Sequence, residues 1–119
     1  MSKTVLIVED DPIVRMMAEE MFIASGFDVE STDRAERAVD VIAQSAKETL
    51  FLFTDVQSPG SIDGVELARI VKRRWPHIQL LVTSAYEIPM ERLPEGVRFA
   101  PKPWSSKNVL GWARSALSS

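Results

Sequence analysis

The sequence contains no cysteine among its 119 residues. Disulfide bonds, thiol nucleophiles and zinc–thiolate sites are therefore excluded. Long apolar runs are also missing: only four consecutive apolar residues, 5–8, precede the first acids. A secretion signal needs ~7–15 apolar residues and a membrane-spanning helix ~20. We therefore expect a soluble protein of the cytoplasm that makes no contact with a membrane.

Positive charge is scarce as well. The chain has 14 Lys and Arg against 17 Asp and Glu, a formal net charge of -3, and no basic cluster larger than residues 72–74. Because nucleic-acid binding rests on neutralising phosphates with clustered Lys and Arg, we expect no nucleic-acid partner. The 45% hydrophobic content supplies a core. The length fits one domain of roughly 100–150 residues, so residues 1–119 are expected to form a single domain.

Short apolar segments predict the strands. They are residues 5–8, 27–30, 50–53, 80–82 and 97–100. Three of them (5–8, 50–53 and 80–82) are apolar without alternation, which is typical of strands covered on both faces of a parallel sheet. The segment 27–30 alternates apolar and acidic residues and is expected at an edge of the sheet.

Helical patterns lie between these strands. Asp11 and Pro12 supply an N-cap and a first-turn proline for a helix through residue 25, which Gly26 ends. Asp33 and Glu36 have the spacing of a capping box and predict the start of a second helix. Two further helices are expected over residues 64–75 and from residue 105 or 106 onward. Alternating strands and helices predict an α/β fold with a doubly wound, five-stranded parallel sheet.

One helix is expected to depart from this pattern. Pro89 and Pro94 interrupt the segment between the fourth and fifth strands. Because proline breaks the hydrogen bonding of a helix interior, this helix is expected to be short or irregular.

Polar side chains follow the strands at their carboxyl ends, where open α/β sheets bind ligands. They are Glu9, Asp10 and Asp11 after the first strand, Asp55 after the third, Thr83 and Ser84 after the fourth, and Lys102 after the fifth. Carboxylates at close range repel unless a cation is present, and oxygen-only ligands suit Mg²⁺. Taken alone, the acidic run at 9–11 is better explained as a solvated helix start; its convergence with Asp55, Thr83 and Lys102 favours a site.

These motifs together resemble the receiver domain of two-component response regulators. The resemblance rests on residues 5–12 (VLIVEDDP), 53–56 (FTDV), Pro59, Asp63-Gly64, residues 81–84 (LVTS) and 102–104 (KPW). It covers essentially the whole chain, in order. It implies a flavodoxin-like, CheY-like fold with strand order 2-1-3-4-5.

The resemblance also implies a role for each strand-end residue. Asp55 is the expected phosphoacceptor, assisted by Lys102 and Thr83. Mg²⁺ is expected to bind Asp10 directly, Glu9 through a metal-bound water, Asp55, and the backbone carbonyl of Gln57. Thr83 is the expected switch residue, with Phe99 as the aromatic that follows it, although Phe99 could equally be a plain core residue. Asp11 falls outside the acidic pair, and the Lys102–Pro103 bond is expected to be cis.

The implied function is a phosphorylation-dependent signalling switch. Such a receiver takes a phosphoryl group from a histidine kinase or phosphotransfer protein and signals by contacting a downstream protein, without acting as an enzyme on other molecules. Trp104 and Trp112 are candidate partner anchors or core residues. The sequence leaves open whether the protein forms a homodimer. It also leaves open whether the protein stands alone or is a receiver of a longer chain.

Two departures from the family pattern stand out. The loop 59–64 is one residue longer than the common form, and Ser58 stands where Met often precedes the loop proline. The segment 85–95, with Tyr86, Ile88 and Met90, predicts a nonstandard output surface. Gln57 and Ala85 are expected to tune the lifetime of the aspartyl phosphate, in a direction left open.

Three other functions fit parts of the sequence. The first is a pseudo-receiver that binds a protein without being phosphorylated. The second is an aspartyl-phosphate phosphohydrolase, which would need a second carboxylate where Gln57 stands. The third, a flavodoxin-like cofactor binder, would need a phosphate-binding loop in place of the acidic run 9–11.

Overall fold

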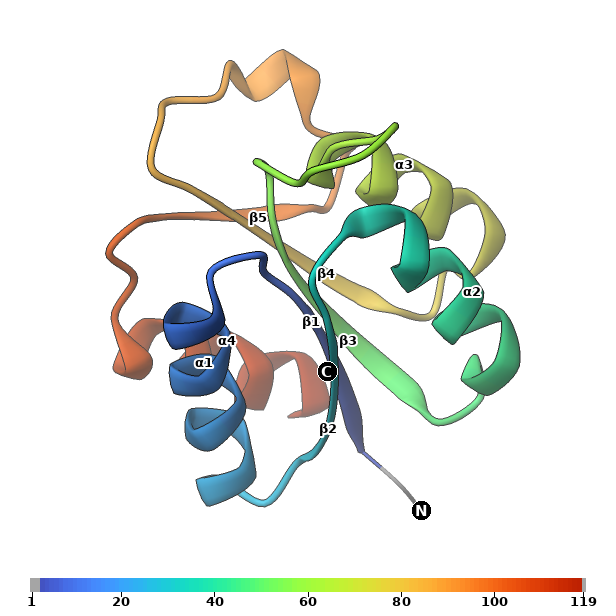
Figure 1. The fold of residues 1–119 in the computed structure, drawn as a ribbon. Helices are drawn as coiled ribbons and strands as arrows, with labels where there is room; N and C mark the ends of the chain where they lie inside the picture. Colours follow the sequence, from blue (N-terminus) through green and yellow to red (C-terminus); the bar gives the residue numbers. More distant parts are fainter. Residues whose placement is uncertain (1–2, 119) are drawn as a thin grey trace.

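The computed structural model describes residues 3–118 and consists of one sheet between two layers of helices (Figure 1). The strands are β1 (Thr4–Val8), β2 (Asp28–Thr32), β3 (Thr49–Asp55), β4 (Gln79–Ser84) and β5 (Arg98–Pro101). All pairs are parallel, in the order β2-β1-β3-β4-β5. This confirms the doubly wound parallel sheet, its strand order and the edge position of the second strand.

Helices cover both faces of the sheet. They are α1 (Pro12–Ala24), α2 (Ala35–Ser45), α3 (Gly64–Arg74) and α4 (Ser106–Ser118). Figure 1 shows α1 and α4 on one face and α2 and α3 on the other. Between β4 and β5 the chain forms only the 3₁₀ turn η1 (Met90–Arg92), as the two prolines predict. Within residues 3–118, no helix has the length and apolar content needed to cross a membrane.

The alternation of side chains along the strands divides the core in two. One buried cluster joins Val5, Ile7, Phe51, Phe53, Leu81 and Ala100 of the sheet to α1 and α4. The other joins Leu6, Val8, Leu52, Leu80 and Val82 to α2 and α3. Because successive strand residues point to opposite faces, each series can be continued past the strand end. The series on the α1/α4 face continues to Glu9, Asp55, Thr83 and Lys102.

Contacts between aromatic rings hold α1 and α4 against the face of the sheet that they cover. Phe22 of α1 meets Phe53 of β3 edge to face, with ring centroids 5.7 Å apart. Trp112 of α4 meets Phe51 in the same way at 5.3 Å, and Trp104 meets Phe53 at 5.4 Å. Edge-to-face pairs stabilise the core beyond the area that they bury. Both tryptophans therefore have a packing role, whatever else they contact.

The helix starts show one confirmed prediction and one error. The Asp11 carboxylate caps α1 by accepting from the N–H groups of Ile13 and Val14. The capping box predicted at Asp33 and Glu36 is wrong: α2 begins at Ala35 after Arg34, with no side-chain cap from its own segment.

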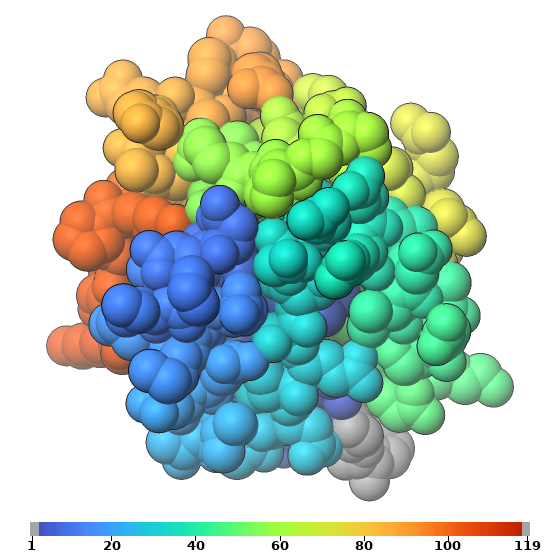
Figure 2. All heavy atoms as spheres, in the orientation of Figure 1, coloured from blue at the N-terminus to red at the C-terminus, as the bar shows by residue number. Residues whose placement is uncertain are grey.

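A neighbouring loop supplies the cap instead. The N–H of Ala35 donates to Ser58 Oγ at 2.8 Å. The Glu36 carboxylate accepts from the Ser61 hydroxyl at 2.8 Å and from its N–H at 3.3 Å, and these bonds lower the pKa of Glu36. The loop between β3 and α3 thus lies against the start of α2, as Figure 2 shows for the green and teal segments. Asp33 pairs with Arg34 and Arg37 instead.

The start of α3 lies directly against the end of β3. Asp63 and Glu66 form a capping box there, and the N–H of Gly64 donates to the carbonyl of Val56 at 2.9 Å. A Cβ at Gly64 would lie 2.1 Å from the backbone oxygen of Asp55. Only glycine allows this approach, so Gly64 fixes the distance between α3 and the strand that carries Asp55.

The irregular segment between β4 and β5 is tied to the same helix. Arg92 forms an ion pair with Asp63 at 3.2 Å, and Arg69 of α3 donates to the carbonyl of Arg92 at 2.5 Å. Tyr86 and Met90 of this segment are exposed. Ile88, which the sequence also offered for the output surface, is half-buried and packs against the α2/α3 core together with Leu93 and Val97. The segment is therefore anchored at η1 and leaves only part of its apolar side chains on the surface.

Gly64→Ala is expected to lower the free energy of unfolding by about 3 kcal/mol, because the added methyl group collides with rigid backbone. Gly111→Ala is the matched control. Gly111 lies in α4 with open space around it, so alanine should stabilise the helix by about 0.5–1 kcal/mol. Urea denaturation of both variants measures the difference. Equal effects would contradict the close approach at Gly64.

Candidate functional site

Three carboxylates gather at the carboxyl edge of the sheet. Oxygen atoms of Glu9, Asp10 and Asp55 lie within 4.8 Å of one another. Glu9 is 4% exposed and Asp55 3%, whereas Asp10 faces solvent. The structure thus brings together the acidic residues that the sequence placed at two different strand ends.

Lys102 lies between the two buried carboxylates. Its Nζ donates to Glu9 Oε1 at 2.7 Å and to Asp55 Oδ2 at 2.9 Å. Its backbone N–H donates to the carbonyl of Ser84 at 2.8 Å, and the Lys102–Pro103 peptide bond is cis, as the resemblance implied. The ammonium group of Lys102 therefore compensates the negative charges of two carboxylates, one after β1 and one at the end of β3.

Burial and pairing set the protonation of this cluster. Burial is the largest influence on Glu9 and raises its pKa, and the nearby charge of Asp55 raises it too; the hydrogen bonds from Lys102 and from the N–H of Asp11 offset only part of this. Burial alone would lower the pKa of Lys102, but its hydrogen bonds to Glu9 and Asp55 outweigh burial and raise it. Lys102 is thus held in its protonated form, while burial, with a smaller contribution from the Asp55 charge, raises the pKa of Glu9.

Thr83 is the neighbour of Asp55 on the next strand. The two residues are register partners in the β3–β4 pair, so their side chains lie on the same face. Thr83 is fully buried, and its hydroxyl has no hydrogen-bond partner among the described residues. A buried hydroxyl without a partner costs free energy. A hydrogen bond from Thr83 to a new acceptor at Asp55 would therefore be favourable.

Gln57 lies two residues beyond Asp55, and both its backbone and its side chain form hydrogen bonds. Its N–H donates to Asp55 Oδ1 at 3.2 Å. Its side-chain Oε1 accepts from Ser84 Oγ at 3.1 Å, and Ser84 Oγ in turn accepts from the N–H of Tyr86 at 3.0 Å. The sequence singled out Ser84 only as the second member of a hydroxyl pair; no local pattern indicated its bond to Gln57.

Two predicted residues stand apart from the cluster. Phe99 is half-buried and packs against the α2/α3 core, on the face opposite to Thr83, with Val82 as its register partner. Asp11 caps α1 and contributes only its N–H, which donates to Glu9 Oε2 at 3.2 Å. Arg15, which the sequence did not indicate, donates to the carbonyl of Glu9 at 3.0 Å and steadies the end of β1.

The donor set fits a divalent metal ion with hard-ligand preferences. All side-chain donors in the cluster are carboxylate oxygens, and one of them, Asp10, is open to solvent. Mg²⁺ is bound in proteins by one or two carboxylates while it keeps several waters. A cation at this position would favour the ionised form of Glu9, whose pKa is raised mainly by burial and in smaller part by the charge of Asp55.

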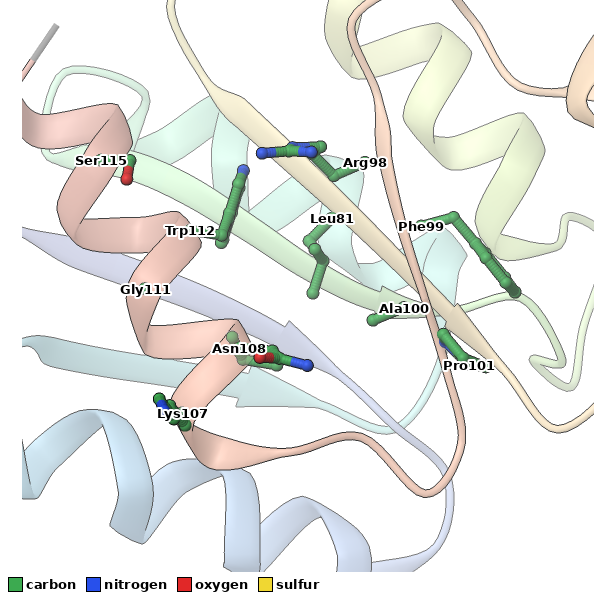
Figure 3. A pocket seen from close by; sticks show the side chains of 11 residues that line it. Leu81, Arg98, Phe99, Ala100, Pro101, Lys107, Asn108, Gly111, Trp112 and Ser115 are labelled. Atoms are coloured by element: carbon green, nitrogen blue, oxygen red, sulfur yellow. The ribbon is translucent and has the colours of Figure 1, made fainter.

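Two hollows flank this edge of the sheet. A largely apolar depression of about 340 Å³ lies beside Lys102; Val14, Met17, Ala85, Pro103 and Trp104 complete its lining. A groove of about 480 Å³ lies between β5 and α4, where Figure 3 shows Arg98 and Trp112 at its rim and Leu81 at its floor. None of the carboxylates lines either hollow, and the depression shares only Lys102 with the site.

This fold, with its carboxylate cluster, lysine and threonine at the strand ends, defines a receiver domain. A family model described as the response regulator receiver domain matches residues 5–98, and the chain belongs to that family. Receiver domains of this family act in two-component systems and are generally signalling modules that are not enzymes.

Named relatives agree with this assignment. The response regulator protein FleR of Pseudomonas aeruginosa is 32% identical over 98% of this chain, which covers 25% of that protein. The sensor kinase CckA of Brucella abortus is 30% identical over 91% of this chain, covering 12% of that kinase. The response regulator MprA of Mycobacterium tuberculosis is 31% identical over 98% of this chain, which covers 51% of that protein. The chain thus spans about half the length, or less, of these relatives.

Solved structures give the same fold. The receiver domain of the hybrid histidine kinase CckA is 29% identical, with a TM-score of 0.82 and coverage of 96% of this chain and 98% of that one. A response regulator receiver domain from Clostridium thermocellum has a TM-score of 0.88 at 14% identity, covering 98% and 94% of the two chains. At that identity, the second likeness shows the fold alone.

Lys102→Met should lower the free energy of unfolding, measured without divalent metal at about pH 7, by about 3 kcal/mol, since it leaves two buried carboxylates unpaired. Loss of Lys102 removes one of the influences that lower the pKa of Glu9. A carboxyl group whose pKa is raised on folding destabilises the protein as pH rises above its usual value of 4.5. The deficit should therefore shrink at about pH 5.

Lys107→Met is the control for this experiment, because Lys107 is an exposed residue of α4. Its effect should stay within about 0.5 kcal/mol at both pH values. Thermal and urea unfolding in the presence of a chelator measure both variants. A Lys102→Met deficit that grew on acidification would contradict the assigned role of Lys102.

Proposed function

We propose that this protein is a phosphorylation-dependent signalling switch whose phosphoacceptor is Asp55. The observation that carries the proposal is the pairing of Asp55 with Thr83. A buried carboxylate bonded to Lys102 lies in register with a buried hydroxyl that has no partner among the described residues. An acceptor group added to Asp55 would satisfy that hydroxyl.

The proposed reaction is phosphoryl transfer from a phosphohistidine on a histidine kinase or phosphotransfer protein. An oxygen of the Asp55 carboxylate attacks phosphorus, the phosphorus–nitrogen bond breaks, and the imidazole leaves with the electron pair. Such transfers depend on positioning and on neutralising the equatorial oxygens. The Lys102 ammonium, 2.9 Å from Asp55 Oδ2, is placed to supply one of the charges.

Mg²⁺ is the proposed cofactor, and when bound it would neutralise charge on the phosphoryl oxygens. Asp10, Asp55 and the backbone carbonyl of Gln57 are its proposed ligands, with Glu9 acting through water. The separation of at most 4.8 Å between the acidic oxygens supports this assignment. The Gln57 N–H bond to Asp55 holds the proposed carbonyl ligand close to the carboxylate.

The proposed switch begins at Thr83. The phosphoryl group carries about two negative charges, about one more than the carboxylate that it modifies, and three acceptor oxygens, so the Thr83 hydroxyl would turn to donate to it. We propose that Phe99 responds on the opposite face, where it packs beside Val82, the residue preceding Thr83. The change would thereby pass through the sheet to the α3 side, where the segment 85–97 is anchored to α3 through Arg92.

The surface around the site supports a protein partner. A phosphohistidine can reach Asp55 only if its protein contacts the rim of the site. That rim carries exposed Ile13 and Met17 of α1 and the apolar depression beside Trp104. We propose that the phosphodonor binds here, since exposed apolar side chains next to a reactive group are typical of interaction surfaces.

The proposed output is contact with a downstream protein, with the cytoplasm as the location. Tyr86 and Met90 of the irregular segment are exposed, and the groove between β5 and α4 presents Trp112 (Figure 3). These surfaces are the candidates for the downstream contact. A homodimer through the same surfaces stays a candidate assembly, and neither a nucleic acid nor a membrane is among the proposed partners.

Incubation with acetyl phosphate and Mg²⁺ should add one phosphoryl group per chain, detected as a mass increase of the intact protein. Asp55→Asn should abolish the increase, because the nucleophilic carboxylate is lost. Asp40→Asn, an exposed acid of α2, is the matched control and should be modified normally. No mass increase, or an increase that persists in Asp55→Asn, would contradict the proposal and favour a pseudo-receiver. Turnover of the donor far beyond one equivalent would favour a phosphohydrolase.

Asp10→Asn should weaken Mg²⁺ binding by roughly tenfold or more, since even residues that merely support metal ligands cost ~10–100-fold when changed. Titration of tryptophan fluorescence measures the affinity, with Trp104 beside Lys102 as the expected reporter. Glu20→Gln, an exposed acid further along α1, serves as control and should bind normally. Equal affinities of both variants would contradict Asp10 as a metal ligand.

A further inference from the structure

The loop between β3 and α3 lies against the start of α2 (Figure 2) and is tied to it at two points. Ser58 Oγ accepts from the N–H of Ala35 at 2.8 Å. The Glu36 carboxylate accepts from the hydroxyl and the N–H of Ser61, at 2.8 and 3.3 Å. Both serines belong to the segment in which the sequence departs from the family pattern. The contact with α2 is therefore a property of this chain's own loop.

The loop approaches α2 closely enough to exclude a side chain at Gly60. This residue has a φ of +109°, which favours glycine, and a Cβ there would lie 2.6 Å from Glu36 Oε1. Arg34 lies on the same carboxylate, with its NH1 atom 3.6 Å from Glu36 Oε1. The place of the loop is thus set by α2 as well as by the strand that precedes it.

The Ser58 bond acts on the peptide group that carries the carbonyl of Gln57. That carbonyl and the N and Cα atoms of Ser58 lie in one plane, because the peptide bond has partial double-bond character. The N–H of Gln57 donates to Asp55 Oδ1 at 3.2 Å and holds residue 57, while the hydroxyl of Ser58 holds residue 58 through Ala35. The peptide group between them is therefore restrained from both sides.

We propose that Ser58 is a positioning residue for the metal ion: by bonding to the start of α2 it fixes the peptide group of the Gln57 carbonyl, and the bonds between Glu36 and Ser61 assist it. The inference rests on the proposed function, in which that carbonyl is a ligand of Mg²⁺. A loop that is already ordered loses less conformational freedom when the ion binds, so the affinity is higher. The start of α2 thereby supports the metal site without supplying a proposed ligand.

The test is the Mg²⁺ affinity of matched variants, titrated by tryptophan fluorescence and checked by calorimetry. Ser58→Ala should raise the Kd about three- to tenfold, the range set by one hydrogen bond. Ser45→Ala is the control, because it removes a serine bond to the carbonyl of Val41 at the other end of the same helix. Its affinity should equal that of the unmodified protein.

A second pair of variants tests the other tie. Glu36→Ala removes both bonds to Ser61 and should also weaken Mg²⁺ binding about three- to tenfold. It removes a negative charge as well, so Asp40→Ala is its control: Asp40 is an exposed acid one turn further along α2. This control should bind Mg²⁺ like the unmodified protein. The pair keeps the test decisive if Ser58→Ala, at a half-buried position, does not fold.

Hydrogen exchange separates positioning from a general loss of stability. Coupling between two events is reciprocal, so a Ser58–Ala35 bond that favours Mg²⁺ binding is itself favoured by Mg²⁺ to the same extent. Saturating Mg²⁺ should therefore slow exchange of the Ala35 N–H about three- to tenfold in the unmodified protein. Ser58→Ala should lose this slowing, whereas a merely structural serine would leave the effect of Mg²⁺ the same in both proteins.

Three results would overturn the inference. The first is an unchanged Mg²⁺ affinity in folded Ser58→Ala or, if that variant does not fold, in Glu36→Ala. The second is an equal loss of affinity in these variants and in their controls. The third is the same effect of Mg²⁺ on Ala35 exchange with and without the Ser58 hydroxyl.

Failure of the proposed function gives a different result. The unmodified protein would then not bind Mg²⁺, or Asp10→Asn would bind it as tightly as the unmodified protein does. Weak binding by Asp10→Asn together with normal binding by Ser58→Ala would refute the inference alone.

Discussion

The pairing of one ammonium group with two buried carboxylates is the interaction on which the carboxyl edge of the sheet depends. Lys102 reaches back from beyond β5 to Glu9 after β1 and Asp55 at the end of β3, so β5 shares one charge centre with two strands from which β4 separates it. Removing two carboxylates from water is costly unless a cation accompanies them. The fold meets that cost with a residue that also serves the proposed chemistry, although burial still raises the pKa of Glu9. The three acidic residues at this edge have oxygen atoms close enough together to hold a metal ion.

Much of the fold was predictable because the signals are local. Unalternating apolar runs marked the buried strands, Asp11 and Pro12 marked the start of α1, and Pro89 with Pro94 marked the absence of a regular helix before β5. The acidic pair, Asp55, Thr83 and Lys102 were predictable for a different reason. Parallel strands align their carboxyl ends, so residues that follow the strands meet without any knowledge of tertiary contacts.

What the sequence did not reveal depends on contacts between distant segments. The box predicted at Asp33 and Glu36 failed because Ser58 and Ser61, more than twenty residues away, occupy the groups that it would have used. The hydrogen bond from Ser84 Oγ to Gln57 Oε1 also joins separate segments, and nothing in either segment indicates it. The position of Phe99 on the face opposite to Thr83 follows from strand register, which periodicity alone does not fix.

The shared face of Glu9, Asp55, Thr83 and Lys102 has a consequence for how this protein tolerates change. Each side chain reaches the site only because its strand keeps the alternation that buries the apolar residues before it. Inserting or deleting a single residue in β1, β3 or β4 would turn the functional group to the other face and expose the apolar residues at the same time. Substitutions can alter the chemistry while the fold survives, but length changes within these strands abolish both together. We therefore expect changes in length to be tolerated in the loops, such as the loop between β3 and α3 that caps α2.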